Sequence, residues 1–301
     1  MIIIHVMGGL GNQLYQYALS EKLKTLGKEV KLDLYAYKDA LGEEREWRPL
    51  ELERLEGLEY EVCTKEERTL FLDSSMKLTD RVRRKLTGRK SKVVNETGDY
   101  MPEIFAMDDV YLYGFWGCER YYRDIIALLQ EKIQFPPTAD PANHEAVAEM
   151  ERTNSVSVHI RRKDYLTVAD GKRYMGICTE DYYNGAFDYI RSKVDTPVFY
   201  IFSDDAEYAR EHFREANMRI VDWNTGEDSM YDMELMSHCK HNICANSTFS
   251  IWGARLNRHR DKLMIRPLHH DNYETASPEE IHENWRGWAL LNAVGDVVYE
   301  G

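Results

Sequence analysis

A histidine and an arginine, His159 and Arg161, stand two residues apart at the end of an apolar segment. In an extended strand, residues two apart share a face, so both side chains would point to the same side of a sheet. The planar guanidinium of arginine matches phosphate oxygens, and a histidine beside it could move a proton. A lone histidine is more often structural, but this pair at a strand end predicts an anion-binding site.

Two further polar groups follow apolar segments in the second half of the chain. The first is Ser203, Asp204 and Asp205; the second is Asn246, Ser247, Thr248 and Phe249. Carboxylates suit hydrogen bonds to a ribose or a guanine edge, although serine and aspartate are also favoured helix caps. The second group precedes a helix-like segment, whose first amides either bind an anion or receive an ordinary cap. Together with Arg161, these groups predict a pocket for a nucleotide diphosphate.

Divalent metals often hold nucleotide diphosphates through paired carboxylates. No Asp-x-Asp triplet occurs in the sequence, and the nearest pattern is Asp232-Met233-Glu234. The sequence therefore predicts neither a metal nor a resident cofactor.

The first half of the chain contains one glycine-rich turn, Gly8-Gly9-Leu10-Gly11, followed by Asn12 and Gln13. In the dinucleotide fingerprint a third glycine lets the helix pack on the strand, but Leu14 occupies that position. Asp33 could be offered as the ribose-binding acid, yet an aspartate at a strand end is common. The turn is better explained as a backbone-lined loop near a small polar ligand, or as a tight turn with Asn12 as the N-cap.

These residues need a scaffold that places strand ends together. Residues 2–6, 29–34 and 110–115 are predicted strands, and residues 12–26 and 119–130 are predicted helices. The proline-rich segment 135–141 breaks the pattern, since paired prolines continue neither a helix nor a strand ladder. The alternation then restarts, with predicted strands at 155–160, 198–203, 219–222, 241–244 and 263–265, and predicted helices at 180–194, 205–216, 229–238 and 247–256. The pattern indicates two α/β domains, 1–135 and 136–285, followed by a C-terminal tail, 286–301.

The composition excludes several classes of protein. The chain has 301 residues, 39 Lys and Arg against 52 Asp and Glu, and a net charge of −13, which disfavours a nucleic-acid partner. No apolar stretch is long enough to span a membrane. The 5 cysteines include no Cys-x-x-Cys pair, and no signal peptide is evident, so we expect a cytoplasmic protein. One basic run, from Arg81 to Lys92, is either solvated surface or a peripheral contact with anionic lipid or a phosphorylated carrier.

Four motifs resemble the α-1,2-fucosyltransferases of glycosyltransferase family 11 and keep the order found in that family. They are Gly8-Gly9-Leu10-Gly11-Asn12-Gln13, continuing to Ala18; His159-Ile160-Arg161-Arg162-Lys163-Asp164-Tyr165; Phe202-Ser203-Asp204-Asp205; and Asn246-Ser247-Thr248-Phe249, continuing to Ala254. The resemblance implies an α/β fold of the GT-B type, with two Rossmann-like domains facing across a cleft. The donor GDP-β-L-fucose would bind the C-terminal domain, and the acceptor would lie largely against the N-terminal one.

The resemblance also implies an inverting, metal-independent transfer of L-fucose to the 2-hydroxyl of a terminal galactoside, in an oligosaccharide or a lipid-linked surface glycan. Arg161, His159 and Asn12 are the implied catalytic residues. The implied donor-binding residues are Gly11, Arg161, Ser203, Asp204, Asp205, Asn246, Ser247, Thr248 and Phe249. Gln13, Asp164 and Tyr165 are candidates on the acceptor side. The base is left open among His159, Asp164 and a carboxylate of the N-terminal domain, and a loose transition state assisted by Asn12 and phosphate could dispense with a strong base. The alternatives are another linkage, another GDP-sugar, or a nucleotide-sugar-binding protein without catalysis.

Overall fold

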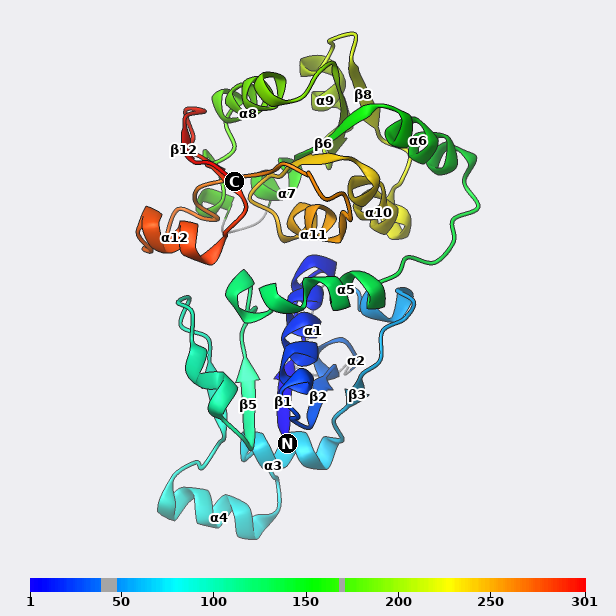
Figure 1. Ribbon diagram of the computed structural model, residues 1–301. Helices are drawn as coiled ribbons and strands as arrows, with labels where there is room; N and C mark the ends of the chain where they lie inside the picture. Colours follow the sequence, from blue (N-terminus) through cyan, green and yellow to red (C-terminus); the bar gives the residue numbers. More distant parts are fainter. Residues whose placement is uncertain (39–47, 168–170) are drawn as a thin grey trace. The chain divides into compact units, whose positions relative to one another are not determined.

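Two sheets organise the chain, one in each of the units Met1–Lys132 and Ile133–Gly301 (Figure 1). The computed structural model describes residues 1–38, 48–167 and 171–301. Both sheets are mainly parallel and carry helices between successive strands, so the prediction of two Rossmann-like α/β domains is confirmed. The cleft between the domains stays a prediction.

The sheet of the first unit has the strand order β3-β2-β1-β5-β4, and its neighbouring strands pair in parallel. Its strands are β1 Ile2–His5, β2 Val30–Asp33, β3 Glu61–Val62, β4 Val93–Asn95 and β5 Val110–Tyr113. The chain proceeds from β1 to β2 and β3 on one side, and later adds β5 on the other side of β1. The strand order therefore reverses between β1 and β5, and ligands commonly bind at such a switch point.

The helices of the first unit are α1 Leu10–Thr25, α2 Tyr35–Lys38, α3 Lys65–Leu72, α4 Leu78–Thr87 and α5 Ile126–Lys132, with 3-10 turns at Leu52–Arg54, Pro102–Ala106, Glu119–Tyr121 and Arg123–Ile125. The predicted opening of strand, turn, helix and strand is confirmed. Gly27 follows α1 with φ +77°, as a left-handed helix stop requires. The single helix expected at 119–130 is wrong, because Tyr122 leaves the helical region (φ −141°) and α5 begins only at Ile126.

The sheet of the second unit has the strand order β12-β11-β10-β9-β6-β7-β8. Its strands are β6 Asn154–Ile160, β7 Pro197–Ser203, β8 Met218–Val221, β9 His241–Ile243, β10 Met264–Pro267, β11 Ala289–Leu291 and β12 Val297–Tyr299. The chain moves from β6 to β7 and β8, then returns to the other side of β6 for β9. The switch point of this sheet therefore lies between β6 and β9.

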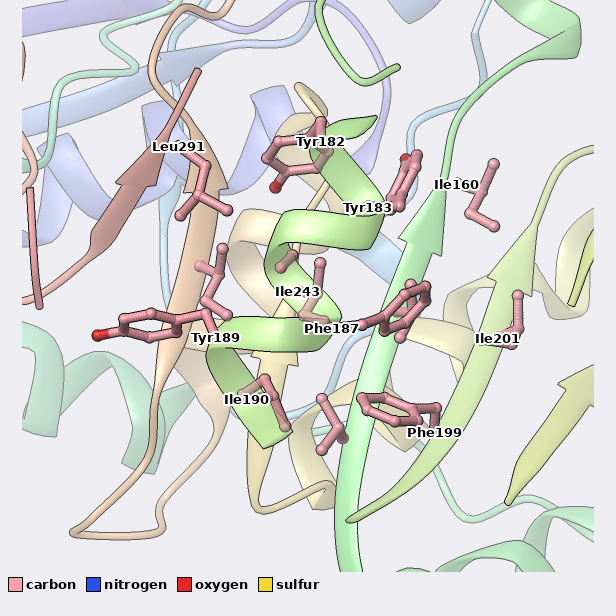
Figure 2. Close-up of a cluster of buried hydrophobic side chains, with 14 of the residues drawn as sticks. Ile160, Tyr182, Tyr183, Phe187, Tyr189, Ile190, Phe199, Ile201, Ile243 and Leu291 are labelled. Carbon is pink, nitrogen blue, oxygen red and sulfur yellow. The ribbon is translucent and has the colours of Figure 1, made fainter. Parts of the chain in front are cut away.

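The helices of the second unit are α6 Pro141–Arg152, α7 Lys163–Thr167, α8 Glu180–Lys193, α9 Ala206–His212, α10 Met230–His238, α11 Thr248–Leu256 and α12 Pro278–Asn284, with 3-10 turns at Gly171–Arg173 and Gly226–Ser229. Helix α8 covers one face of the sheet, where its residues Tyr182, Phe187 and Ile190 pack on strand residues such as Ile201 and Ile243 (Figure 2). Burial of these side chains fixes the sheet, and thereby the ends of its strands.

The segment 286–301 is not the tail that we expected. It forms β11, which pairs in parallel with β10, and β12, which pairs antiparallel with β11. Residues Leu290 and Leu291 are completely buried, so the segment completes the core of the second unit. No helix in the described ranges combines the length and the apolar character that crossing a membrane requires.

Candidate active site

The two sequence groups that were expected to bind phosphate meet at the switch point of the second sheet. Arg161 directly follows β6, and the segment from Asn246 to Thr248 follows β9 and leads into α11. Val158 of β6 pairs with Ile243 of β9, so both segments leave the carboxyl ends of neighbouring strands. The structure therefore brings a guanidinium and a helix start to one edge of the sheet.

Asp204, which follows the neighbouring strand β7, holds the arginine segment in place. Its Oδ1 accepts hydrogen bonds from the backbone amides of Arg162 (2.8 Å) and Lys163 (3.2 Å). Its Oδ2 lies 3.4 Å from Nε of Arg161. Both carboxylate oxygens are thus engaged by the turn after β6, and Asp204 positions Arg161. We had expected this carboxylate to bind a nucleoside.

Asp205 and Ser203 also have partners within the chain. The Asp205 carboxylate caps α9 by accepting from the amide of Tyr208 (3.4 Å), and it lies 3.2 Å from Nη1 of Arg162. The Ser203 hydroxyl accepts a hydrogen bond from the Asp205 amide (3.0 Å). The capping alternative therefore describes Asp205 better than the nucleoside role, because burial of its carboxylate is compensated by these contacts.

Helix α11 begins without a side-chain cap. Ser247 is its N-cap residue, but the Ser247 side chain accepts no hydrogen bond from the first turn. The first amides of a helix have no partner within the helix and carry partial positive charge, so they suit a phosphate oxygen. The helix is fixed close to α10, since a Cβ on Gly253 would lie only 2.7 Å from Cβ of Met236. Thr248 and Phe249 form the half-buried first turn.

Asn246 and Tyr165 link the two sides of the switch point. The Tyr165 hydroxyl donates to the backbone oxygen of Asn246 (2.8 Å). The buried Asn246 amide donates to the backbone oxygens of Tyr174 (3.1 Å) and His270 (3.0 Å), and it accepts from Sγ of Cys178 (3.5 Å). Both amide hydrogens of Asn246 are therefore used in fixing loops. This result differs from the direct donor contact that we expected for Asn246.

His159 is the last inward-facing residue of β6 on the side of α11, and its ring centre lies 5.9 Å from that of Phe249. Only 4% of the residue is exposed, and within the described structure Nδ1 has no hydrogen-bond partner. Burial, with a further contribution from the charge of Arg161, lowers the pKa of His159 to about 3. The imidazole is therefore neutral near pH 7 and is poorly suited to act as a general base.

In the first unit, the glycine turn connects β1 to α1. Gly9 is the N-cap residue of α1, so the prediction of Asn12 as the N-cap is wrong. Gly8 has φ +81°, and a Cβ there would lie 2.5 Å from Nδ2 of Asn12. Only glycine fits this position, because the Asn12 side chain folds over the turn. Gly11 and Asn12 both lie in the first turn of α1.

Gln13 is completely buried and joins the glycine turn to residues 49–52 by hydrogen bonds. Its amide donates to the backbone oxygens of Gly8 (2.8 Å) and Pro49 (2.9 Å), and its oxygen accepts from the amides of Glu51 (2.9 Å) and Leu52 (3.1 Å). The side chain has no capacity left for an acceptor sugar. The expectation that Gln13 binds the acceptor is therefore not supported.

Glu51, which the sequence did not single out, occupies the start of α1. Its Oε2 accepts a hydrogen bond from the amide of Leu10 (2.9 Å). A protein carboxylate thus stands where a dinucleotide phosphate would have to bind. Only the glycine turn itself hinted at such an anion, because Glu51 lies far from this turn in the sequence.

Asp33 is fully buried and cannot serve as a ribose-binding acid. It accepts hydrogen bonds from the Tyr111 hydroxyl, from Nε of Arg68 (2.8 Å) and from the amide of Tyr35 (2.9 Å). Burial by itself would raise the pKa of Asp33, but hydrogen bonds, notably from His5 and Tyr111, outweigh burial and lower it to about 2. The dinucleotide interpretation therefore lacks both its phosphate site and its ribose site.

Two remaining predictions concern Asp164 and metals. The backbone of Asp164 belongs to α7, and its side chain lies outside the described residues. Within residues 1–38, 48–167 and 171–301, no group of three His, Cys, Asp or Glu side chains could hold a metal ion. Metal independence stays a prediction.

A doubly wound α/β unit with an arginine and an uncapped helix start at its switch point defines a class of proteins that can bind phosphate-bearing ligands. Comparison with known proteins narrows this class. The chain belongs to glycosyltransferase family 11, since the model described as "Glycosyl transferase family 11" matches residues 1–289.

Similar proteins include two that are named as α-1,2-glycosyltransferases. The chain is 32% identical over 284 residues to an α-1,2-colitosyltransferase of Escherichia coli, covering 89% of this chain and 91% of that protein. It is 33% identical over 104 residues to galactoside α-(1,2)-fucosyltransferase 1 of Ateles belzebuth, covering 34% of this chain and 28% of that protein. Among solved structures, a mutant of Arabidopsis thaliana FUT1 in complex with GDP aligns with a TM-score of 0.47 at 11% identity, covering 89% of this chain and 71% of that chain.

Proposed function

We propose that this glycosyltransferase is an inverting α-1,2-fucosyltransferase that moves L-fucose from GDP-β-L-fucose to the 2-hydroxyl of a terminal galactoside. The observation that carries the proposal is the meeting of Arg161 and the first turn of α11 at the β6/β9 switch point. The names of the relatives support the sugar class and the α-1,2 linkage. We place the reaction in the cytoplasm, where the five cysteines, all unpaired, would stay reduced.

In the proposed reaction, the bond between C1 of fucose and the β-phosphate oxygen breaks, and GDP leaves with the bonding electrons. The galactoside O2 bonds to C1 from the opposite face, and its proton passes to solvent or to phosphate. Negative charge develops on the β-phosphate, so Arg161 and the α11 amides, fixed beforehand, lower the barrier. No metal is required, because these groups supply the positive charge.

His159 has a different role in this proposal from that of a base. Its neutral, buried ring has an Nδ1 atom without a partner in the described structure, which is costly unless a ligand supplies one. We assign it a hydrogen bond to the bound donor. The half-buried Asn12, in the first turn of α1, is proposed to contact the reacting sugar.

The proposal is tested by incubating the protein with GDP-fucose and simple β-galactosides, namely lactose, lacto-N-biose and N-acetyllactosamine, with EDTA or with Mg²⁺. We expect a product with an α-1,2 linkage by NMR, formed at the same rate in both buffers. An α-1,3 or α-1,4 product would overturn the linkage, and loss of activity in EDTA would overturn metal independence. Tight GDP binding without transfer or donor hydrolysis would favour the non-catalytic binding protein.

The similarity to an α-1,2-colitosyltransferase favours a second candidate donor, GDP-colitose. Colitose lacks the 3-hydroxyl of fucose, so a site that hydrogen-bonds this hydroxyl would strongly prefer fucose, whereas an apolar site would prefer colitose. The ratio of kcat/KM for the two donors decides between them. A ratio above about 100 in either direction would identify the donor.

A further inference from the structure

Helix α4 exposes its apolar face and turns its polar face toward the protein, the opposite of an ordinary surface helix. Leu78, Val82 and Leu86 are four residues apart and therefore share one face, which we call the α4 apolar stripe. Their exposed fractions are 73%, 50% and 79%, and no residue of the helix is buried. A helix that packed on a core would bury this face.

The polar side of α4 attaches the helix to the rest of the unit. Arg83 and Arg84 form ion pairs with the buried Asp73, which also accepts a hydrogen bond from the Lys90 amide (2.8 Å). Asp80 accepts from the Ser75 hydroxyl (2.6 Å). These contacts fix the polar side of α4 against the first unit. The apolar stripe on the opposite side is therefore held facing outward.

Basic side chains flank the stripe. Between residues 73 and 92 eight basic residues oppose two acidic ones, a net charge of +6 in a chain of net charge −13. Several of these cations are committed to the attachment, but five exposed ones form no ion pair with any described residue. They are Lys77, Arg81, Lys85, Arg89 and Lys90. An exposed apolar face rimmed by cations marks an interaction surface whose partner is apolar and anionic.

We propose that α4 docks this protein onto an anionic lipid bilayer, with the apolar stripe in the headgroup region and the five cations on acidic headgroups. A lipid surface offers both required chemistries in one plane. A second copy of the chain fits less well, because pairing two stripes would bring their cationic flanks together. Figure 1 places α4 at the end of the first unit where β1 begins, so docking leaves the opposite, carboxyl end of that sheet uncovered.

The experiment is co-sedimentation of the full chain with vesicles of phosphatidylcholine alone or mixed with phosphatidylglycerol. We expect binding to the anionic vesicles that weakens with added salt, and at least tenfold weaker binding to the neutral ones. The variant R81Q/K85Q should bind about 30-fold more weakly, since each basic residue near an anionic surface contributes roughly a fivefold factor. The variant L78S/V82S/L86S should lose at least tenfold.

Matched controls are Val294→Ser, at a position 66% exposed in the second unit, and Arg260→Gln, also at an exposed position. Neither should change binding. The proposal would be overturned if wild-type protein did not bind anionic vesicles, or if the α4 variants bound them as tightly as wild type. A dimer in sedimentation velocity that the triple serine variant dissociates, without vesicle binding, would assign the stripe to a second copy. Transfer to a soluble acceptor is measured separately and should not change in the α4 variants, so this test is independent of the donor.

Discussion

Replacing Arg161 with alanine tests the assignment of the phosphate site most directly. If Arg161 contacts the departing β-phosphate, the substitution removes one charge-assisted donor from a prearranged site. Such donors contribute about 3–4 kcal/mol to transition-state stabilisation, so kcat should fall roughly 100- to 1,000-fold. GDP binding, measured by calorimetry, should weaken less than kcat falls, because the charge on the phosphate increases in the transition state.

The neighbouring arginine provides the matched control. Arg162 lies over the ring of Tyr208 at 4.4 Å and pairs with Asp205, so its guanidinium serves the start of α9. The guanidinium of Arg162 is half-exposed, so its pair with the buried Asp205 contributes up to about 1 kcal/mol, and Arg162→Ala should cost less than about fivefold in kcat. Arg161→Lys keeps the charge but loses the planar fork, so it should stay at least about tenfold below wild type.

Steady-state rates of GDP release, with thermal melts to confirm folding, measure these effects. The reasoning fails if Arg161→Ala retains kcat within threefold of wild type, or if Arg162→Ala loses more activity than Arg161→Ala. In either case the guanidinium that Asp204 positions would not be the phosphate-binding group.

Three other predictions follow from burial and hydrogen bonding. Gln13→Ala should destabilise the fold by at least about 3 kcal/mol in urea unfolding, because four backbone groups lose their bonds to this completely buried side chain, whereas Asn12→Ala should cost under about 1 kcal/mol but lower transfer at least tenfold. The fold lowers the pKa of Asp33 from 3.8 to about 2, so the contribution of its carboxylate to the free energy of unfolding is present above pH 3.8 and is lost as pH falls through 2. Asp33→Asn should therefore cost about 2 kcal/mol at pH 7 and nearly nothing at pH 2. The ring nitrogens of His159, followed by NMR, should show no titration between pH 5 and 8, and a midpoint near 6.5 would contradict its burial.

The sequence located the ends of strands well, and this is why the groups that it singled out as phosphate ligands meet at one edge of the second sheet. Arg161 and Ser247 follow apolar segments, and parallel strands bring their carboxyl ends to one edge whatever the loops between them do. The short strands β11 and β12 escaped prediction because three residues are too few for a periodic signal. The helix expected at 119–130 failed because the non-helical backbone of Tyr122 interrupts it, in a segment where Tyr121 and Tyr122 are both completely buried.

The roles of individual polar residues were harder to predict, because they depend on partners far away in the sequence. Gln13 looked like a sugar ligand until the structure showed it bonded to residues 49–52, and Asp204 looked like a nucleoside ligand until it was found holding Arg161. Likewise, the pKa of His159 is set by burial, which no local motif reports. A residue type fixes which bonds are available, and the fold decides which of them are used.

The missing side-chain cap at the start of α11 shows how an unused hydrogen bond can point to function. In the second unit α6, α8, α9 and α12 each begin with a side-chain cap, supplied by Asp140, Thr179, Asp205 and Ser277. Helix α10 continues a 3-10 turn. Helix α11 begins with Ser247, a residue able to cap, whose side chain makes no such bond. Leaving the first amides uncapped costs stability, typically about 1 kcal/mol. That cost is best explained if a ligand phosphate accepts hydrogen bonds from these amides. The phosphate would then lie at the carboxyl edge of the second sheet, where Asp204 also positions Arg161.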